Sequence, residues 1–376
     1  MIRILVLGMN PGIGGVQTYL INLYKNIVDY GIQMDFVISG NHCYYSDEIK
    51  KLGGQIFYIC PKKKNVITNI IDLFKVFFKC RKTHKIVYFN FSVLYYNIPF
   101  ILAKMFRYPI IISHAHSTKS PTMKKGIRYF LHCLNRIDVT HRSDYLLACS
   151  KLAAEWVFGK KALEKGKVKI VRNAIYIEKY VYDEDIRNNI REKLGISKDH
   201  FVIGHIGRLS YEKNQLYLID IFKEIYEINN NAILLLVGDG KQRSKIESII
   251  SKYQLKDNVL LLGARSDVYE LLQAMDVFVL PSYNEGLGIV LIEAQTSGLY
   301  CFASKYVIPD EVNITGLVNF IELNKSPKYW ADQIMKYSRG YQRKSMDKEV
   351  KKAGYDIIDM SKKFREFIFS ISKVQI

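Results

Sequence analysis

Two glutamates and a glycine turn stand late in the chain, just after an apolar strand predicted over 277–280. The segment PSYNEGLGIVLIEAQTSGL (281–299) places Glu285 before the glycines and Glu293 eight positions later. A helix that begins after 286–288 directs unpaired N–H groups and the positive end of its dipole at a ligand above the strand. The two carboxylates can then accept hydroxyl groups from two parts of that ligand. This layout suits a nucleotide sugar, although an ordinary crossover with surface glutamates has a similar pattern.

A pair of basic residues follows another predicted strand about 80 residues earlier. In FVIGHIGRLSYEKNQLYLIDIFKEI (201–225) the strand ends at Gly207, Arg208 follows at once, and Lys213 stands beside the start of an amphipathic helix. Ligands of open α/β sheets bind in the crevice at such strand ends. A planar guanidinium and a compact ammonium group together suit a diphosphate. Alone, each would be typical of a solvated surface charge.

These segments resemble glycosyltransferase family 4, a family of retaining enzymes, and most closely its members from bacterial capsule and exopolysaccharide synthesis. The resemblance covers nearly the whole chain and is carried by GIGGVQTYLINL (12–23), GRLSYEKN (207–214), LVGDGKQRSKIE (236–247) and LLGARSDVYELLQAMDVFVLPSYNEGLGIVLIEAQTSG (261–298). It implies an α/β protein of the GT-B fold, with two Rossmann-like domains facing each other across a cleft. Ala174, where the family usually has glycine, and Leu299-Tyr300, where a proline is usual, depart from the pattern.

The resemblance and the residue patterns together give a set of candidate site residues. His116 matches the position of a family histidine near the donor sugar, and His114 is the alternative from the same strand end. The catalytic candidates are Glu285, Arg208, Lys213 and His116. The donor-binding candidates are Gly14, Gly15, Arg208, Lys213, Gly286, Leu287, Gly288, Ile289 and Glu293, and those at the rim are His114, Asn173, Asp239 and Arg265.

Alternation of apolar strands and amphipathic segments predicts two series of α/β units. The first domain is expected over 1–176 and the second over 177–357, with a polar linker with short helices over 176–200 between the two series of strands. The amphipathic segment 358–376 is expected to be a helix, and the resemblance implies that it crosses back to the first domain. The expected strands lie at 2–8, 34–39, 86–90, 109–116, 145–150, 168–175, 201–208, 232–240, 259–263, 276–281 and 300–304.

Length and composition agree with two domains of ordinary size. The chain has 376 residues, 49% of them hydrophobic, and its six cysteines are scattered without a C-x-x-C pair. That usage indicates a reduced, cytoplasmic protein without disulfides or a zinc site. The N-terminus runs directly into a strand and a glycine loop, which is unlike a signal peptide. The uncharged segment 86–103 reaches the lower length limit of a membrane span, but its polar residues favour a strand, a loop and an apolar helix.

Positive charge is concentrated in the first half of the chain. Residues 1–176 carry 27 Lys and Arg against 9 Asp and Glu, whereas 177–376 carry 28 against 27. The excess gathers around 62–85 and 123–136, where Ile67, Ile70, Ile71, Phe74, Phe77 and Phe78 alternate with lysines in the first of these segments. Such a pattern indicates attachment to an anionic membrane surface. A packed helix with a solvated basic face is the alternative, and no nucleic-acid-binding motif accompanies the charge.

The prediction is a retaining glycosyltransferase that moves a hexose or N-acetylhexosamine from a nucleotide diphosphate sugar, with UDP as the expected carrier. The acceptor is a lipid-linked oligosaccharide, and the enzyme is peripheral on the inner face of the cell membrane. No cofactor or metal is expected, because the acidic run at 183–185 lies in the polar linker. A non-catalytic sugar-nucleotide-binding protein of the same fold is the alternative. If His116 acted as a general base from the opposite face, the product would be inverted.

Overall fold

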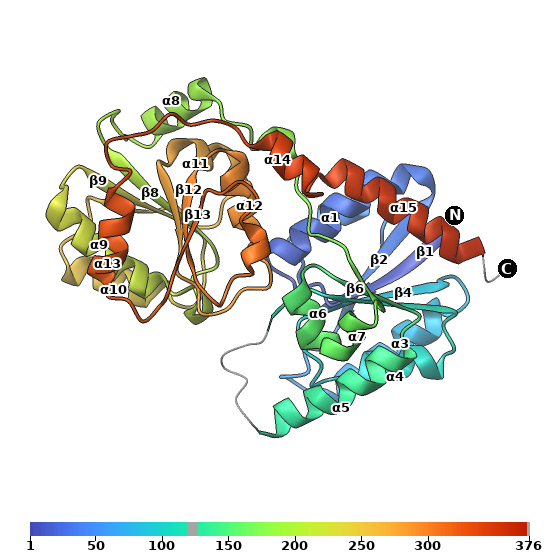
Figure 1. The fold of residues 1–376 in the computed structure, drawn as a ribbon. Coiled ribbons are helices and arrows are strands. Elements are labelled where there is room, and N and C mark those ends of the chain that lie inside the picture. Colours follow the sequence, from blue (N-terminus) through green and yellow to red (C-terminus); the bar gives the residue numbers. More distant parts are fainter. Residues whose placement is uncertain (119–125, 374–376) are drawn as a thin grey trace. The chain divides into compact units, whose positions relative to one another are not determined.

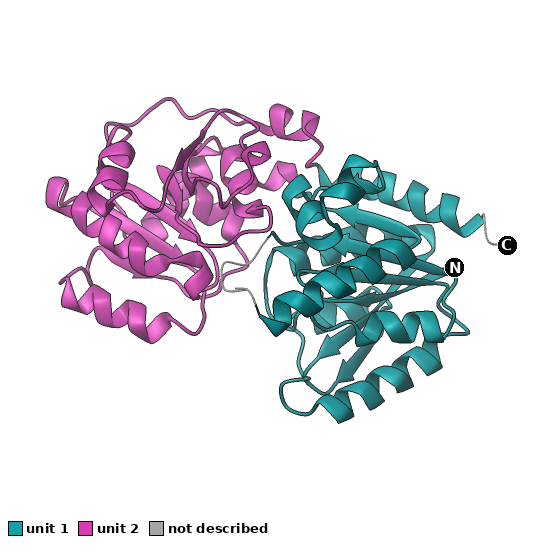
Figure 2. Ribbon diagram, turned by 60° about the horizontal axis from the view of Figure 1, so that its bottom comes forward, with its two compact units in different colours: residues 1–175, 356–376 teal, residues 176–355 magenta. Residues whose placement is uncertain are grey.

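The computed structural model describes residues 1–118 and 126–373. The chain forms two compact units, coloured teal and magenta in Figure 2. Unit 1 comprises residues 1–175 and 356–376, and unit 2 comprises residues 176–355. The sequence placed the first boundary one residue later, after 176, and the return of the chain two residues later, at 358. Each unit is a parallel sheet with helices on it.

Unit 1 contains a seven-stranded parallel sheet in the order β3-β2-β1-β4-β5-β6-β7. From β1 the chain runs outward to β3, returns to β4 beside β1, and then runs outward to β7. This reversal makes β1 and β4 the switch point of the sheet. The strands are β1 (Ile2–Leu7), β2 (Ile32–Ser39), β3 (Ile56–Ile59), β4 (Ile86–Phe91), β5 (Ile110–Ala115), β6 (Tyr145–Ala148) and β7 (Val168–Ile170).

The helices of unit 1 divide between the two faces of this sheet. Right-handed crossovers place the helices before and after the reversal on opposite faces, and Figure 1 shows this arrangement. The first group is α1 (Gly15–Ile27) and α2 (Ser46–Lys51), and the second is α3 (Val66–Cys80), α4 (Ile98–Met105), α5 (Ile127–Arg142), α6 (Lys151–Phe158) and α7 (Lys160–Glu164). The C-terminal helix α15 (Ile357–Lys373) packs on α1, and the Tyr19 hydroxyl bonds the Met360 sulfur there. The expected return of the C-terminal helix to the first domain is confirmed.

Unit 2 contains a six-stranded parallel sheet in the order β10-β9-β8-β11-β12-β13. Its switch point lies between β8 and β11. The strands are β8 (Phe201–Ile206), β9 (Ala232–Val237), β10 (Val259–Leu261), β11 (Val277–Leu280), β12 (Tyr300–Ser304) and β13 (Val318–Ile321). The helices are α8 (Glu184–Lys193), α9 (Gln215–Ile228), α10 (Arg243–Lys252), α11 (Val268–Ala274), α12 (Ile289–Thr296), α13 (Pro327–Met335) and α14 (Asp347–Lys352).

Apolar runs that are buried along their whole length form the centre of each sheet. β9 (AILLLV) and β11 (VFVL) contain only buried residues, as expected for parallel strands covered on both faces. The segment 86–103 forms β4, a loop and most of α4, which confirms that interpretation. Within the described residues, none of the helices combines the length and apolar composition that crossing a membrane requires.

Two strands were not predicted from the sequence. They are β3 and β13, which are both edge strands of four residues. The polar segment 176–200 contains a short helix as expected, and this helix, α8, packs on α11 within unit 2. Asp183, the first residue of the acidic run, is the N-cap of α8 and accepts hydrogen bonds from the N–H groups of Asp185 and Ile186.

Candidate functional site

The predicted diphosphate and sugar residues follow the two strands at the switch point of unit 2. β8 and β11 pair directly, with Val277 opposite Ile203 and Phe278 opposite Gly204. Arg208 stands two residues after β8, and Glu285 stands five residues after β11. Because the connections from these strands lead to opposite sides of the sheet, their loops border the crevice where such sheets bind ligands. The sequence motifs are thus brought together at one sheet edge.

The loops after β8 and β11 are tied together by backbone and side-chain contacts. Asn214 has a left-handed conformation (φ 57°), and its side-chain amide donates to the carbonyl of Pro281 at 3.0 Å. The N–H of Tyr283 donates to the carbonyl of Glu212 at 2.7 Å, and the rings of Tyr211 and Tyr283 stack with centroids 5.1 Å apart. These contacts fix the position of the residue between Glu212 and Asn214.

That residue is Lys213, and its ammonium group forms an ion pair with Glu285. The carboxylate of Glu285 is 8% exposed and also accepts a hydrogen bond from the Ser282 hydroxyl at 3.0 Å. The sequence patterns place Lys213 at the diphosphate and Glu285 at hydroxyl groups of the ligand, and they give no indication that the two residues pair. A pair between a cation and an anion at the crevice can offer both a donor for phosphate and an acceptor for hydroxyl groups.

His205 on β8 supports this loop and was not singled out from the sequence. Its Nδ1–H donates to the carbonyl of Val279 at 2.8 Å, and its Nε2 accepts from the Gln215 amide at 3.1 Å. Burial lowers the pKa of His205 to about 4, which is consistent with this neutral form. The Gln215 amide also donates to the carbonyl of Arg208 at 2.8 Å. The buried pair therefore connects the core of the sheet with the loop that carries Arg208 and Lys213.

The Arg208 side chain is exposed at this sheet edge. Within residues 1–118 and 126–373 its guanidinium makes no hydrogen bond or ion pair. The backbone at the base of its loop is closely packed against Gly238. A Cβ at Gly238 would lie 2.0 Å from the carbonyl oxygen of Gly207. Gly238 also has φ +138°, which favours glycine. Arg208 is thus a free cation on a closely packed loop.

The helix after β11 begins where the sequence predicted. Gly288, with φ 75°, is the N-cap of α12, and the helix runs from Ile289 to Thr296. Leu287 is buried, so it anchors the turn rather than reaching a ligand. The first turn of α12 contains no acidic side chain. Its N–H groups and the dipole of the helix therefore suit an anion beside the Lys213 loop.

Glu293 lies in the middle of α12 and is 9% exposed. It accepts a hydrogen bond from the Tyr180 hydroxyl at 3.0 Å. Burial raises its pKa to about 7, and the Tyr180 hydroxyl acts in the opposite direction. Within the described residues no cation pairs with this carboxyl group, and a buried carboxyl group with a strongly raised pKa is a candidate for a functional site.

The two predicted rim residues of unit 2 make local contacts. The carboxylate of Asp239 accepts from the N–H of Gly240 at 2.7 Å and lies 3.9 Å from the Arg243 guanidinium. Arg265 forms an ion pair with Asp267, at 2.8 Å for its Nε. Both residues follow the strands β9 and β10 on the outer side of β8. Their assignment to the rim stays a prediction.

The predicted glycines of unit 1 also follow the end of a strand. Gly14 is the N-cap of α1, whose first residue is Gly15, and the loop before it follows β1. At the base of that loop a Cβ on Gly8 (φ +93°) would lie 2.0 Å from the carbonyl oxygen of Asn90. The ends of β1 and β4 are therefore closely packed at the switch point of unit 1.

The two candidate histidines are both buried. His114 lies within β5 and bonds the Tyr88 hydroxyl, so it is part of the core of unit 1. His116 follows β5, and its Nε2 lies 2.8 Å from the side-chain oxygen of Asn90. That oxygen must accept, because the Asn90 amide nitrogen donates to Leu7. His116 therefore carries its proton on Nε2.

The protonation state of His116 bears on the two stereochemical alternatives. Burial lowers its pKa to about 3, against the opposing effect of the Asn173 side chain. The structure thus brings His116 and Asn173 together and keeps the ring neutral at physiological pH. A neutral imidazole with its proton on Nε2 has only Nδ1 left as an acceptor.

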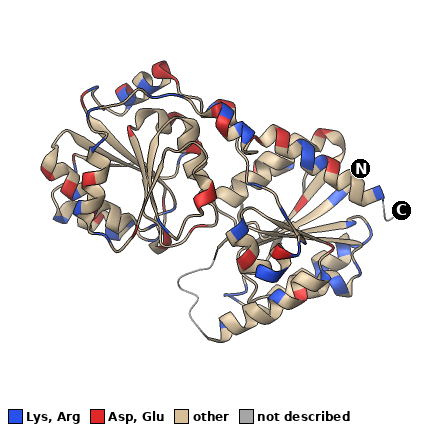
Figure 3. Ribbon diagram, viewed as in Figure 1, with Lys and Arg blue, Asp and Glu red and all other residues tan. Residues whose placement is uncertain are grey.

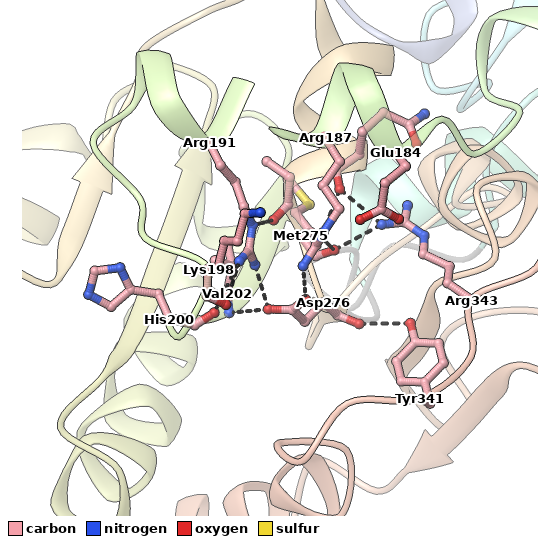
Figure 4. Close-up of polar contacts among 12 residues, drawn as sticks. Glu184, Arg187, Arg191, Lys198, His200, Val202, Met275, Asp276, Tyr341 and Arg343 are labelled. Carbon is pink, nitrogen blue, oxygen red and sulfur yellow. Dashed lines mark hydrogen bonds and ion pairs between the residues drawn. The ribbon is translucent and has the colours of Figure 1, made fainter. Parts of the chain in front are cut away.

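A cluster of arginines lies at the start of β11, at the end of the strand away from the predicted site. It was not predicted from the sequence. Figure 4 shows Arg187, Arg191 and Arg343 around Asp276, the residue before β11. Asp276 also accepts from the N–H of Val202 at 2.7 Å and thereby ties β8 to β11. The guanidinium groups donate to carbonyls at the C-terminal end of α11, where the helix dipole favours cations. The accepting carbonyls belong to Leu272, Gln273, Ala274 and Met275.

This arginine cluster has a structural rather than a catalytic arrangement. Arg343 donates to three of those carbonyls at 2.9–3.0 Å and also to Ser297, and burial lowers its pKa to about 10. Each of the three guanidinium groups thus donates to acceptors of the protein itself. Nothing in the sequence motifs signals them, because Arg343 lies more than 60 residues from the strand it supports.

No group of three or more His, Cys, Asp and Glu side chains in the described part of the chain is arranged to hold a metal ion. Independence from a metal stays a prediction.

Comparison with known proteins identifies relatives of this chain. The family model described as "Glycosyl transferases group 1" matches residues 186–356. EpsF of Bacillus subtilis (strain 168), which is named as a glycosyltransferase, is 30% identical over 366 residues, covering 93% of this chain and 91% of EpsF. The UDP-Gal:alpha-D-GlcNAc-diphosphoundecaprenol alpha-1,3-galactosyltransferase of Escherichia coli is 30% identical over 217 residues, which are 54% of each chain.

A solved structure supports the fold. Anabaena Alr3699/HepE, in complex with UDP and glucose, superposes with a TM-score of 0.80 at 20% identity and covers 98% of this chain and all of that one. At this identity the likeness shows the fold alone. The predicted α/β architecture with two Rossmann-like domains is confirmed.

Proposed function

The chain belongs to the group 1 glycosyltransferases, enzymes of the GT-B fold, and from this we propose that it is a retaining transferase that uses a nucleotide diphosphate sugar. The proposed donor is a UDP-linked hexose or N-acetylhexosamine, and the proposed acceptor is a lipid-linked oligosaccharide in surface polysaccharide synthesis. The name of the E. coli relative includes both a UDP-sugar and a diphosphoundecaprenol acceptor, and the similar Anabaena structure contains UDP. These names support the proposal.

One observation carries the proposal: cationic, anionic and helix-terminal groups converge at the β8/β11 switch point. Charge builds on the leaving diphosphate in the transition state, and groups already in place to receive it lower the barrier. Arg208, Lys213 and the first N–H groups of α12 are those groups here. We assign Glu293 to the ribose hydroxyls and Glu285 to the donor sugar.

In the proposed reaction the acceptor attacks on the side of the leaving diphosphate, and a phosphate oxygen takes the acceptor proton. No protein nucleophile is then required. The buried, neutral His116 is compatible with a binding role beside Asn173 and not with a permanently charged one. Proton NMR of the new anomeric centre decides the stereochemistry: retention supports this route, and inversion would assign the proton to a protein base such as His116.

The donor is identified by a thermal-shift panel of UDP-, GDP-, ADP- and TDP-sugars. A ligand present at 100 times its dissociation constant stabilises the native state by about 2.7 kcal/mol. We expect UDP-sugars to raise the melting temperature most. A larger shift with another base would change the donor, and no shift with any nucleotide would contradict a nucleotide-sugar site.

We further propose that unit 1 binds the anionic surface of the membrane through one face, here called the α3–α5 face. It lies on the side of the sheet covered by α3, α4 and α5, and large apolar side chains are exposed along these helices: Ile67, Ile71, Phe74, Phe78, Ile101, Met105, Ile127, Phe130, Leu134 and Ile137. The members on α3 recur at helical spacing, as in helices that lie in a membrane interface. Phe77, which the sequence grouped with them, is buried instead.

The charge of the α3–α5 face suits anionic lipid. The three helices contain six Lys and Arg and only two Asp. Figure 3 shows basic positions along unit 1, while acidic and basic positions are mixed on unit 2. Lys63 and Lys64 add exposed charge just before α3, whereas the ammonium of Lys62 lies over the rings of Tyr95 and Tyr96. Lys124 and Lys125 lie outside the described residues.

Replacing Lys63, Lys64 and Lys75 with Glu should weaken co-sedimentation with vesicles that contain acidic phospholipid. Each exposed cation near such a surface contributes about 1 kcal/mol, and salt should release the protein because charges are screened within about 10 Å at 0.1 M. The matched control replaces three exposed lysines of unit 2, Lys245, Lys252 and Lys256, with Glu. Equal binding to neutral and acidic vesicles, or a concentration-dependent dimer in place of lipid binding, would contradict the proposal.

A further inference from the structure

Tyr180 joins the start of unit 2 to the helix that carries Glu293. Only four residues separate it from Ile175, the last residue of the first segment of unit 1. Its hydroxyl donates to Oε1 of Glu293 at 3.0 Å, and its own carbonyl accepts from the Ser297 hydroxyl at 2.8 Å. Glu293 and Ser297, the C-cap of α12, are one helical turn apart. Tyr180 is thus fixed to this helix at two points.

The neighbouring residues of the segment are also fixed to unit 2. The Gln273 amide donates to the carbonyl of Val181 at 3.3 Å, and the N–H of Tyr182 donates to the Ser345 hydroxyl at 2.8 Å. These bonds hold the backbone around Tyr180 independently of its ring. The position of the backbone at Tyr180 therefore does not depend on the hydrogen bond between its hydroxyl and Glu293.

The environment of Glu293 explains what this hydroxyl contributes. A buried carboxylate is costly unless hydrogen bonds or a cation compensate the lost hydration. Burial raises the pKa of Glu293 to about 7, and the bond from Tyr180 is the interaction that lowers it. Since the hydroxyl occupies Oε1, it leaves Oε2 for a second donor.

Within the described residues, none of the charged groups on the elements that pack against α12 forms an ion pair with Glu293. β12 carries no charged side chain, and the Lys213–Glu285 pair precedes the helix. Arg343 binds the carbonyl of Ser297 and those of α11. On α14 one residue, Asp347, is half-buried and the other charged residues are exposed: Lys348, Glu349, Lys351 and Lys352.

We propose that Tyr180 is a positioning residue of the donor site, whose hydroxyl holds the Glu293 carboxylate ionised and oriented for the ribose hydroxyls of the nucleotide. This inference rests on the proposed assignment of Glu293 to the ribose. Tyr180 does not contact the ligand in this account and acts through Glu293. Tyr180, four residues beyond the start of unit 2, thereby sets the affinity of this unit for nucleotide.

The test measures the affinity of full-length protein for UDP by calorimetry between pH 6 and pH 9. Tyr180→Phe removes the hydroxyl and keeps the ring, and it should weaken UDP binding about tenfold at pH 7, as for loss of a hydrogen bond to a charged group. Tyr182→Phe is the matched control, because the Tyr182 hydroxyl bonds Glu184 at 2.6 Å at the exposed start of α8. It should bind UDP as the wild type does.

The pH profile separates this role from a purely structural one. Binding requires the ionised carboxylate, so affinity is complete above the pKa of Glu293 and falls as the pH falls through it. Loss of the hydroxyl raises that pKa, so in Tyr180→Phe the fall should begin at higher pH, and the difference from the wild type should be smaller at pH 9 than at pH 7. Comparing the two proteins with one nucleotide cancels the titration of UDP itself.

Binding of a dideoxynucleotide tests whether the effect of Tyr180 depends on the ribose hydroxyls. With 2′,3′-dideoxy-UDP, which lacks both ribose hydroxyls, wild type and Tyr180→Phe should bind equally. If Tyr180→Phe weakens both nucleotides alike at every pH, its role is structural and the proposal is overturned. If Glu293→Gln itself leaves UDP affinity and its pH profile unchanged, the assignment of Glu293 to the ribose is wrong, and that failure is distinguishable from a failure of Tyr180 alone.

Discussion

Arg208→Ala should lower turnover about a hundredfold or more while the melting temperature stays unchanged, as expected when one preorganised electrostatic group is removed. The guanidinium is exposed and makes no hydrogen bond or ion pair within the described residues, so its loss leaves no buried group without a partner. The arginine is positioned by the Gln215 amide, which binds the Arg208 carbonyl and not its side chain. The folded loop should therefore survive the substitution.

Lys213→Ala should have a similar kinetic effect but should also lower the melting temperature. It leaves the carboxylate of Glu285, which is 8% exposed, without its cation. Steady-state kinetics with the donor found by the thermal-shift panel measure both variants. Arg339→Ala, which removes an exposed arginine of the same unit, is the matched control. If Arg208→Ala and Lys213→Ala both retain near wild-type turnover, the diphosphate does not bind at the β8/β11 switch point.

The second large effect concerns stability: Glu293→Gln should stabilise the ligand-free protein at pH 8 and weaken nucleotide binding. The native pKa of Glu293 is about 7, above the ordinary value of 4.5. Between these values the native state binds more protons than the unfolded state, so the wild type loses stability as pH rises from about 4.5 to 7. A shift of this size corresponds to about 3 kcal/mol at pH 8, and glutamine, which does not ionise, avoids that loss.

Calorimetric melting at pH 5 and pH 8 measures this effect. The melting temperature of Glu293→Gln should exceed that of the wild type at pH 8, and the difference should shrink at pH 5. Glu192→Gln, on the exposed side of α8, should show no such pH-dependent difference. An equal difference at both pH values would contradict the raised pKa. Burial of the Glu293 carboxylate would then not lower the stability of the wild type.

The sequence predicted the central strands and the site motifs because each of these signals is local. Buried parallel strands read as apolar runs, and the glycine turn with its following helix marks the anion-binding end directly. The short edge strands β3 and β13 were not predicted, because edge strands are less buried and have a weaker hydrophobic pattern. The segment 56–59 has only one fully buried residue.

The contacts that the sequence could not supply join residues far apart in the chain. The partner of Lys213 is 72 residues away, and that of Tyr180 is 113 residues away. Side-chain types at these positions are compatible with several partners, and only the strand order selects one. The charged candidates could thus be named from the chain, while their pairing and the neutral state of His116 depend on the tertiary structure.

The measurement that tests the central claim most directly is a crystal structure of the protein with UDP, or with the nucleotide selected by the panel. We expect the diphosphate within hydrogen-bond distance of Arg208, Lys213 and the first N–H groups of α12, with the ribose hydroxyls on Glu293 and the Tyr180 hydroxyl still on that carboxylate. A nucleotide bound away from the β8/β11 switch point, or a diphosphate that touches neither Arg208 nor Lys213, would contradict the account.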